Sequence, residues 1–106
     1  MKKFKNHIIS IIICLGFFIA TSTFAQSEHS KIDSLNKLAS DLTYSNIDSA
    51  FVIARQANDL SISINYSKGI GYAYFTIGTS FFLIEKVDSA LFYLNKSINT
   101  LEAINN

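Results

Sequence analysis

The chain has 106 residues and a formal net charge of +1, a length that leaves room for one domain. Beyond residue 25 it holds six basic and eight acidic residues, a net charge of −2, and it lacks the clustered Lys and Arg that bind nucleic acid. A single cysteine, Cys14, excludes an internal disulfide. We therefore expect a small domain that is held together by packing alone, which is marginal at this size.

The first 25 residues have the layout of a secretory signal peptide. Three lysines precede an uncharged run over residues 8–20, and small residues stand at positions −3 and −1 of a cut before Gln26. That run is shorter than the ~20 residues that a membrane-spanning helix needs. We expect cleavage after Ala25, so that only the signal segment meets the membrane. An uncleaved anchor is the alternative, because Phe24 interrupts the small residues.

The remainder, residues 26–106, contains an internal repeat with a period of about 40 residues. Residues 47–51 (Ile-Asp-Ser-Ala-Phe) recur at 87–91 (Val-Asp-Ser-Ala-Leu), and the apolar register continues on both sides of this match. Such self-similarity is typical of arrays in which each repeat is one supersecondary unit. The two copies span about 29–66 and 67–106.

Apolar residues in each copy recur at spacings of three and four, which predicts two amphipathic helices per copy. Asp48 and Asp88 suit the first turn of a helix, where a carboxylate meets the positive end of the helix dipole. Ser67 is a candidate N-cap for the third helix. The chain contains no proline to interrupt the helices. The predicted helices cover about 29–44, 48–64, 68–84 and 88–104.

The second copy resembles the tetratricopeptide repeat, whose pattern is aromatic-x-x-Leu-Gly-x-x-Tyr followed by Ala-x-x-x-Phe. The residues that carry the resemblance are Tyr74, Ile77, Gly78, Phe81, Ala90 and Leu94. It implies an all-α, right-handed α-solenoid of antiparallel helix pairs, with Gly78 and Ala90 packed against each other where two helices cross. The chain departs from the pattern in its longer period and in the missing proline.

Long tetratricopeptide variants of this kind are common in exported bacterial proteins. They also form the N-terminal sensor regions of membrane-bound histidine kinases and of transcription regulators. The resemblance thus implies a periplasmic or extracellular protein-interaction scaffold without catalytic activity. The alternative is the sensor segment of a longer signal-transduction protein, here truncated.

In tetratricopeptide arrays the first helix of each pair lines a concave groove, and this places a candidate partner-binding face on the third helix. Its members are Tyr72, Phe75, Thr79, Phe82 and Leu83. The third and fourth helices are apolar nearly all round, so this face either holds a protein or peptide partner or is covered by further repeats or a second subunit. We expect the isolated mature chain to self-associate or to fold only in part.

No arrangement of residues in the sequence points to catalysis, a cofactor or a metal. His29 is the only histidine of the predicted mature chain, and one histidine without cysteine cannot supply an ordinary zinc site. Gly69 and Gly71 lack the rest of a dinucleotide-binding fingerprint and follow no predicted strand. We therefore expect no catalytic, cofactor-binding or metal-binding residues.

Overall fold

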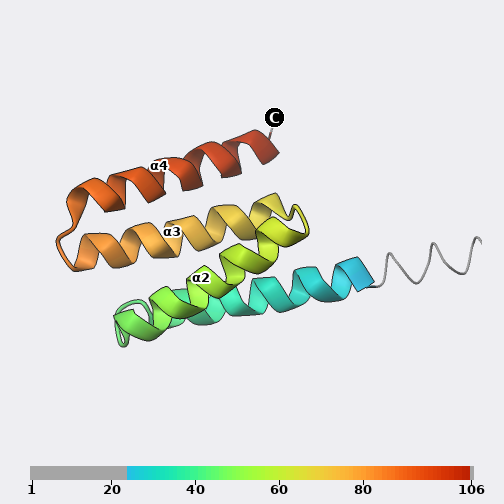
Figure 1. Ribbon diagram of the computed structural model, residues 1–106, viewed down its shortest axis with the longest axis horizontal. Coiled ribbons are helices and arrows are strands. Elements are labelled where there is room, and N and C mark those ends of the chain that lie inside the picture. Colours follow the sequence, from blue (N-terminus) through green and yellow to red (C-terminus); the bar gives the residue numbers. More distant parts are fainter. Residues whose placement is uncertain (1–23, 106) are drawn as a thin grey trace, which may run out of the picture.

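The computed structural model describes residues 24–105, and within them the protein is an all-α domain of four helices without strands (Figure 1). The assignment of residues 1–25 as a signal peptide falls on residues outside this range, apart from its last two. No helix in the described range is long and apolar enough to cross a membrane. The helices cover residues 24–42, α2 (Ile47–Ser63), α3 (Ser67–Leu83) and α4 (Val87–Ile104).

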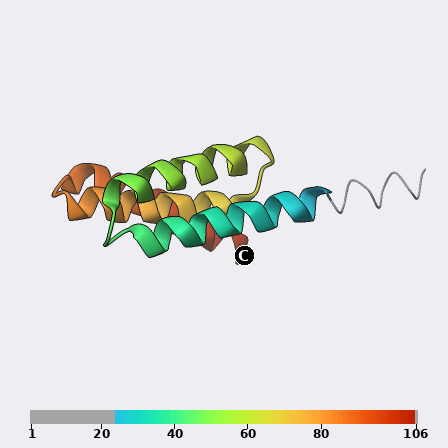
Figure 2. The same cartoon turned by 90° about the horizontal axis from the view of Figure 1, so that it is seen from below.

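Successive helices run antiparallel and pack side by side in chain order (Figure 1). A view turned by 90° shows α2 and helix 24–42 on opposite sides of the layer that α3 occupies (Figure 2). Three of the predicted helices agree with the structure to within one residue at each end. The prediction for the first helix was wrong at its start, because residues 24–28 are also helical and no glycine or proline there stops the helix.

The helix N-termini differ in how they are capped. The Asn46 side chain accepts a hydrogen bond from the Ser49 backbone N–H at 3.1 Å, and Asp48 lies in the first turn of α2. The prediction of Ser67 as the N-cap of α3 was wrong. Tyr66 has the non-helical backbone of the capping position, with φ −91° and ψ 87°, and Ser67 is the first helical residue.

The turns after α2 and α3 share one geometry. Asn65 and Glu85 adopt left-handed backbone conformations, with φ of 56° and 65°. In each turn the next backbone N–H reaches back to a carbonyl in the last turn of the helix: Tyr66 to Ser61 at 2.8 Å, and Lys86 to Phe81 at 3.0 Å. These bonds satisfy carbonyl groups that the helix end leaves without partners.

Small residues let the helices approach closely. Ala39, Ala54 and Ile77 form a buried cluster that joins helix 24–42, α2 and α3, and Ala50, Ala57, Ala73 and Ala90 are also buried. Polar bonds fix the same crossings: the Asn36 side-chain N–H donates to the Gly69 carbonyl at 3.1 Å, and the Ser97 hydroxyl donates to the Gly71 carbonyl at 2.7 Å.

Candidate binding groove between helix 24–42 and α3

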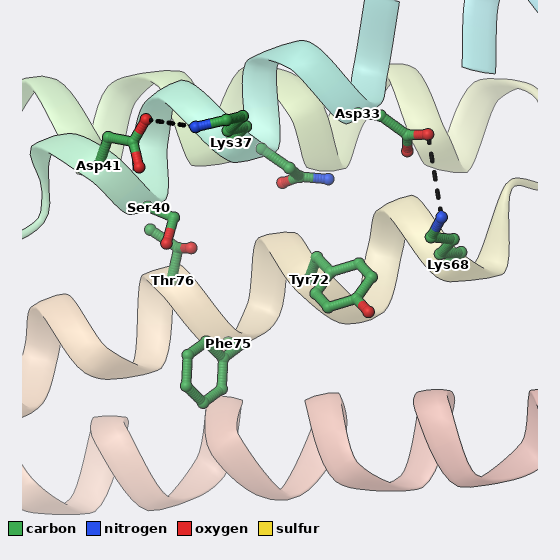
Figure 3. A pocket seen from close by; sticks show the side chains of 9 residues that line it. Asp33, Lys37, Ser40, Asp41, Lys68, Tyr72, Phe75 and Thr76 are labelled. Carbon is green, nitrogen blue, oxygen red and sulfur yellow. Dashed lines mark hydrogen bonds and ion pairs between the residues drawn. The ribbon is translucent and has the colours of Figure 1, made fainter. Parts of the chain in front are cut away.

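A cavity of about 460 Å³ lies between helix 24–42 and α3. Figure 3 shows Lys37 and Asp41 on the first of these helices and Tyr72 and Phe75 on the second. The residues that line it are Asp33, Asn36, Lys37, Ser40, Asp41, Lys68, Tyr72, Phe75 and Thr76. This cavity, hereafter the groove, is built from the first helix of each predicted helix pair.

The predicted partner-binding face lies only partly in the groove. Tyr72 and Phe75 line it, and about half of each side chain is exposed. Thr79, Phe82 and Leu83 do not line it; Thr79 and Leu83 are half-buried and Phe82 is exposed. The structure therefore brings together two of the five residues, and their role in binding stays a prediction.

Sequence reasoning missed the half of the groove that helix 24–42 contributes. Its residues there are polar or charged, so no aromatic or apolar stripe marked them. The offset of 39 residues that relates helix 24–42 to α3 could have identified them. Asp33 and Asn36 are the counterparts of Tyr72 and Phe75, and both line the groove.

The charged side chains of the groove balance one another. The Lys37 ammonium lies 3.0 Å from the Asp41 carboxylate within helix 24–42. The Lys68 ammonium reaches across from α3 to within 4.0 Å of the Asp33 carboxylate (Figure 3). All four side chains are substantially exposed, so each pair adds little stability. The groove is thus neutral and carries both signs of charge.

One buried hydrogen-bond acceptor in the groove has no partner among the described residues. The Asn36 side chain is buried, and its Nδ2 group is held by the Gly69 carbonyl. Its Oδ1 atom is buried and unpaired. An unsatisfied buried acceptor of this kind costs about 1–3 kcal/mol.

Asp33 is held in place at one end of the groove by a tyrosine as well as by Lys68. The Tyr66 hydroxyl donates a hydrogen bond to the Asp33 carboxylate at 2.8 Å, and the Tyr66 ring stacks on His29 with 3.9 Å between centroids. Burial, followed by the hydrogen bond and the negative charge of Asp33, raises the pKa of Tyr66 to about 12. The phenol therefore keeps its proton, and with it the hydrogen bond to Asp33, up to a higher pH than a free tyrosine would.

The residues predicted to pack within the second repeat belong to α3 and α4, and two of them also pack against the first helix pair: Ile77 through the cluster with Ala39 and Ala54, and Phe81 through Phe51. Ile77 and Ala90 are buried, and Tyr74, Phe81 and Leu94 are half-buried. The nearest neighbour of Gly78 is Leu94: a Cβ at Gly78 would lie 2.8 Å from its Cγ and 3.0 Å from its backbone nitrogen. A close crossing thus exists at Gly78, its nearest atoms belong to Leu94 of the predicted set, and the contact between Gly78 and Ala90 stays a prediction.

Tyr93, which sequence reasoning did not include in this set, completes the packing. Its ring lies 5.5 Å from the Phe81 ring and 5.9 Å from the Tyr74 ring. Aromatic pairs at these separations add stability beyond the area that they bury.

No protein-family model, curated protein or solved structure matches the chain. Within residues 24–105, no group of three or more His, Cys, Asp or Glu side chains is placed to hold a metal ion. What the groove offers is aromatic surface and paired charges.

Proposed function

We propose that this protein is an exported interaction scaffold of the tetratricopeptide type, and that its groove binds a peptide segment of a partner protein. The observation that carries the proposal is the groove itself. It places two half-exposed aromatic rings beside two exposed pairs of opposite charges.

The regularity of the fold supports a repeat architecture. α2 and α4 begin 40 residues apart, at Ile47 and Val87, and equivalent positions of the two copies occupy equivalent places in the helices. Gly78 lies at a close crossing of α3 and α4, which is the part that the small residue of the tetratricopeptide pattern plays. Stacking of such pairs generates the right-handed solenoid that we propose.

The chemistry of the groove suits a peptide. Tyr72 and Phe75 offer rings on which an apolar side chain can pack. The balanced charges of Lys37, Asp41, Lys68 and Asp33 favour a ligand without a large net charge.

The proposal includes no reaction and no cofactor, and it places the protein outside the bacterial cytoplasm. The same groove would serve a sensor segment of a longer signalling protein. In this second candidate, further repeats would cover the exposed apolar residues of α4, Leu91 and Phe92 among them.

Selection from a displayed library of random peptides tests the proposal. Residues 26–106 contain all four helices apart from two exposed residues and serve as the bait. We expect selected peptides whose dissociation constant rises about tenfold or more on Tyr72→Ala, because truncating an aromatic hot-spot residue costs about 2 kcal/mol or more and about 1.4 kcal/mol is a tenfold change. Tyr44→Ala is the control, since Tyr44 is more exposed than Tyr72 and lies outside the groove. Equal binding by the two variants would reject the groove as the binding site.

A further inference from the structure

The α3–α4 pair carries an uncovered apolar face. Its members are spaced two helical turns apart on each helix, and between 51% and 60% of each residue is exposed. They are Phe75 and Phe82 on α3 and Leu91 and Ile98 on α4. We call this set the C-terminal face. None of its residues is charged, and only Phe75 also lines the groove.

The corresponding face of the first helix pair is buried. The repeat offsets make Asn36, Thr43, Phe51 and Asn58 the counterparts of Phe75, Phe82, Leu91 and Ile98. Asn36, Thr43 and Asn58 are only 7%, 3% and 8% exposed, and Phe51 is half-buried.

This burial comes in large part from α3. Asn36 bonds to the Gly69 carbonyl, and Phe51 packs edge-on against Phe81 with ring centroids 5.3 Å apart. The same face of the second pair is more apolar, with phenylalanines in place of Asn36 and Thr43 and isoleucine in place of Asn58, yet it has no cover among the described residues.

The outer face of helix 24–42, at the other end of the row of helices, is polar where the C-terminal face is apolar. α3 meets the first pair through buried Gly69, Ala73, Thr76 and Ser80. The counterparts of these residues in helix 24–42 are Ser30, Ser34, Lys37 and Asp41, all of them exposed. Head-to-tail stacking of copies would press the Lys37–Asp41 ion pair against phenylalanine rings, and desolvating an ion pair in that way is unfavourable.

We propose that the C-terminal face pairs with the same face of a second copy of this chain, giving a closed two-fold dimer. An apolar face meets its like without burying any charge, and a contact of a surface with itself closes after two subunits. The polar face of helix 24–42 then remains in water at both ends of the dimer, as the outer faces of solenoid caps do.

Sedimentation velocity and equilibrium of residues 26–106 over a wide concentration range test this proposal. The expected result is a monomer–dimer equilibrium without larger species. Leu91→Glu and, separately, Ile98→Lys should each halve the mass at concentrations where the parent is dimeric, while circular dichroism shows unchanged helix content. Because the two variants alter different turns of α4, one remains informative if the other fails to fold.

Leu38→Glu is the matched control, because Leu38 is a similarly exposed leucine of helix 24–42, at the opposite end of the stack, and this variant should still dimerise. A monomer at every concentration would overturn the proposal and leave the face to a further helix or a different protein. An open-ended series of oligomers, or dimers that persist in both α4 variants, would also overturn it. None of these substitutions is in the groove. Phe75 belongs to both surfaces, but the peptide-binding test rests on Tyr72, which lies outside the C-terminal face, so the two proposals can fail separately.

Discussion

Replacement of Gly78 by alanine tests the close crossing of α3 and α4. An ordinary glycine-to-alanine change inside a helix stabilises by about 1 kcal/mol, because alanine has the higher helix propensity. At Gly78 the added Cβ would lie 2.8 Å and 2.9 Å from the Leu94 Cγ and Cδ2 atoms and 3.0 Å from the Leu94 backbone nitrogen. The side-chain atoms can move aside, whereas the backbone nitrogen moves only if α4 shifts as a whole.

Overpacking of this kind costs typically 1–3 kcal/mol, which outweighs the propensity gain in most of that range. We expect Gly78→Ala to lower the free energy of unfolding by about 1 kcal/mol. Urea unfolding followed by circular dichroism, at one fixed protein concentration, measures the change.

Gly71→Ala is the matched control in the same helix. A Cβ at Gly71 would meet only side-chain atoms of Leu101, at 2.6 Å and 2.7 Å for the two nearest, and Leu101 is half-buried near the end of α4. This side chain can rotate away, so the loss should be smaller than at Gly78. An increase in stability of about 1 kcal/mol for Gly78→Ala, as for an unconstrained helix glycine, would refute the close crossing.

Three further changes test other parts of the structure. Ala90→Leu should lower the free energy of unfolding by roughly 1–3 kcal/mol, because the larger side chain overpacks a buried site. Asn95→Leu, at an exposed position, should change the melting temperature little. Coincident melting curves for the two variants would contradict the predicted packing. Glu85→Gly should gain up to about 1 kcal/mol in urea unfolding, because Glu85 has a φ of 65°. The pKa of Tyr66 is raised from 10.0 to about 12, so the protonated phenol contributes its full share to the free energy of unfolding below pH 10, and this share is lost as the pH rises toward 12. Unfolding measured against pH should show this loss in the parent protein and not in Tyr66→Phe.

The helices could be predicted well from the sequence because the apolar residues keep one register through both copies. α2, α3 and α4 begin and end within one residue of the predicted bounds. Caps were harder, because they depend on turn geometry. Ser67 has the right chemistry for an N-cap, but the left-handed Asn65 puts Tyr66 in the capping position.

Only the α3 side of the groove could be predicted from the sequence. Its α3 side is aromatic and stands out in the sequence, while its other side is made of Asp33, Asn36, Lys37, Ser40 and Asp41, a set that looks like an ordinary solvated helix face. Only the pairing of helix 24–42 with α3 turns these residues into one wall of a cavity. The packing set of the second repeat included Leu94, which supplies the atoms nearest to Gly78, but spacing alone does not choose between Leu94 and Ala90, one helical turn apart.

The central claim is that the groove binds a partner in the cell, and site-specific photo-crosslinking tests it most directly. A photoreactive amino acid replaces Tyr72 in one variant and Tyr44, which lies outside the groove, in a control variant, each in cells that produce the protein. We predict a discrete crosslinked product from position 72 that is absent from position 44 and is lost when a peptide selected for groove binding is added in excess. Identical products from the two positions, or no product from position 72, would contradict the claim.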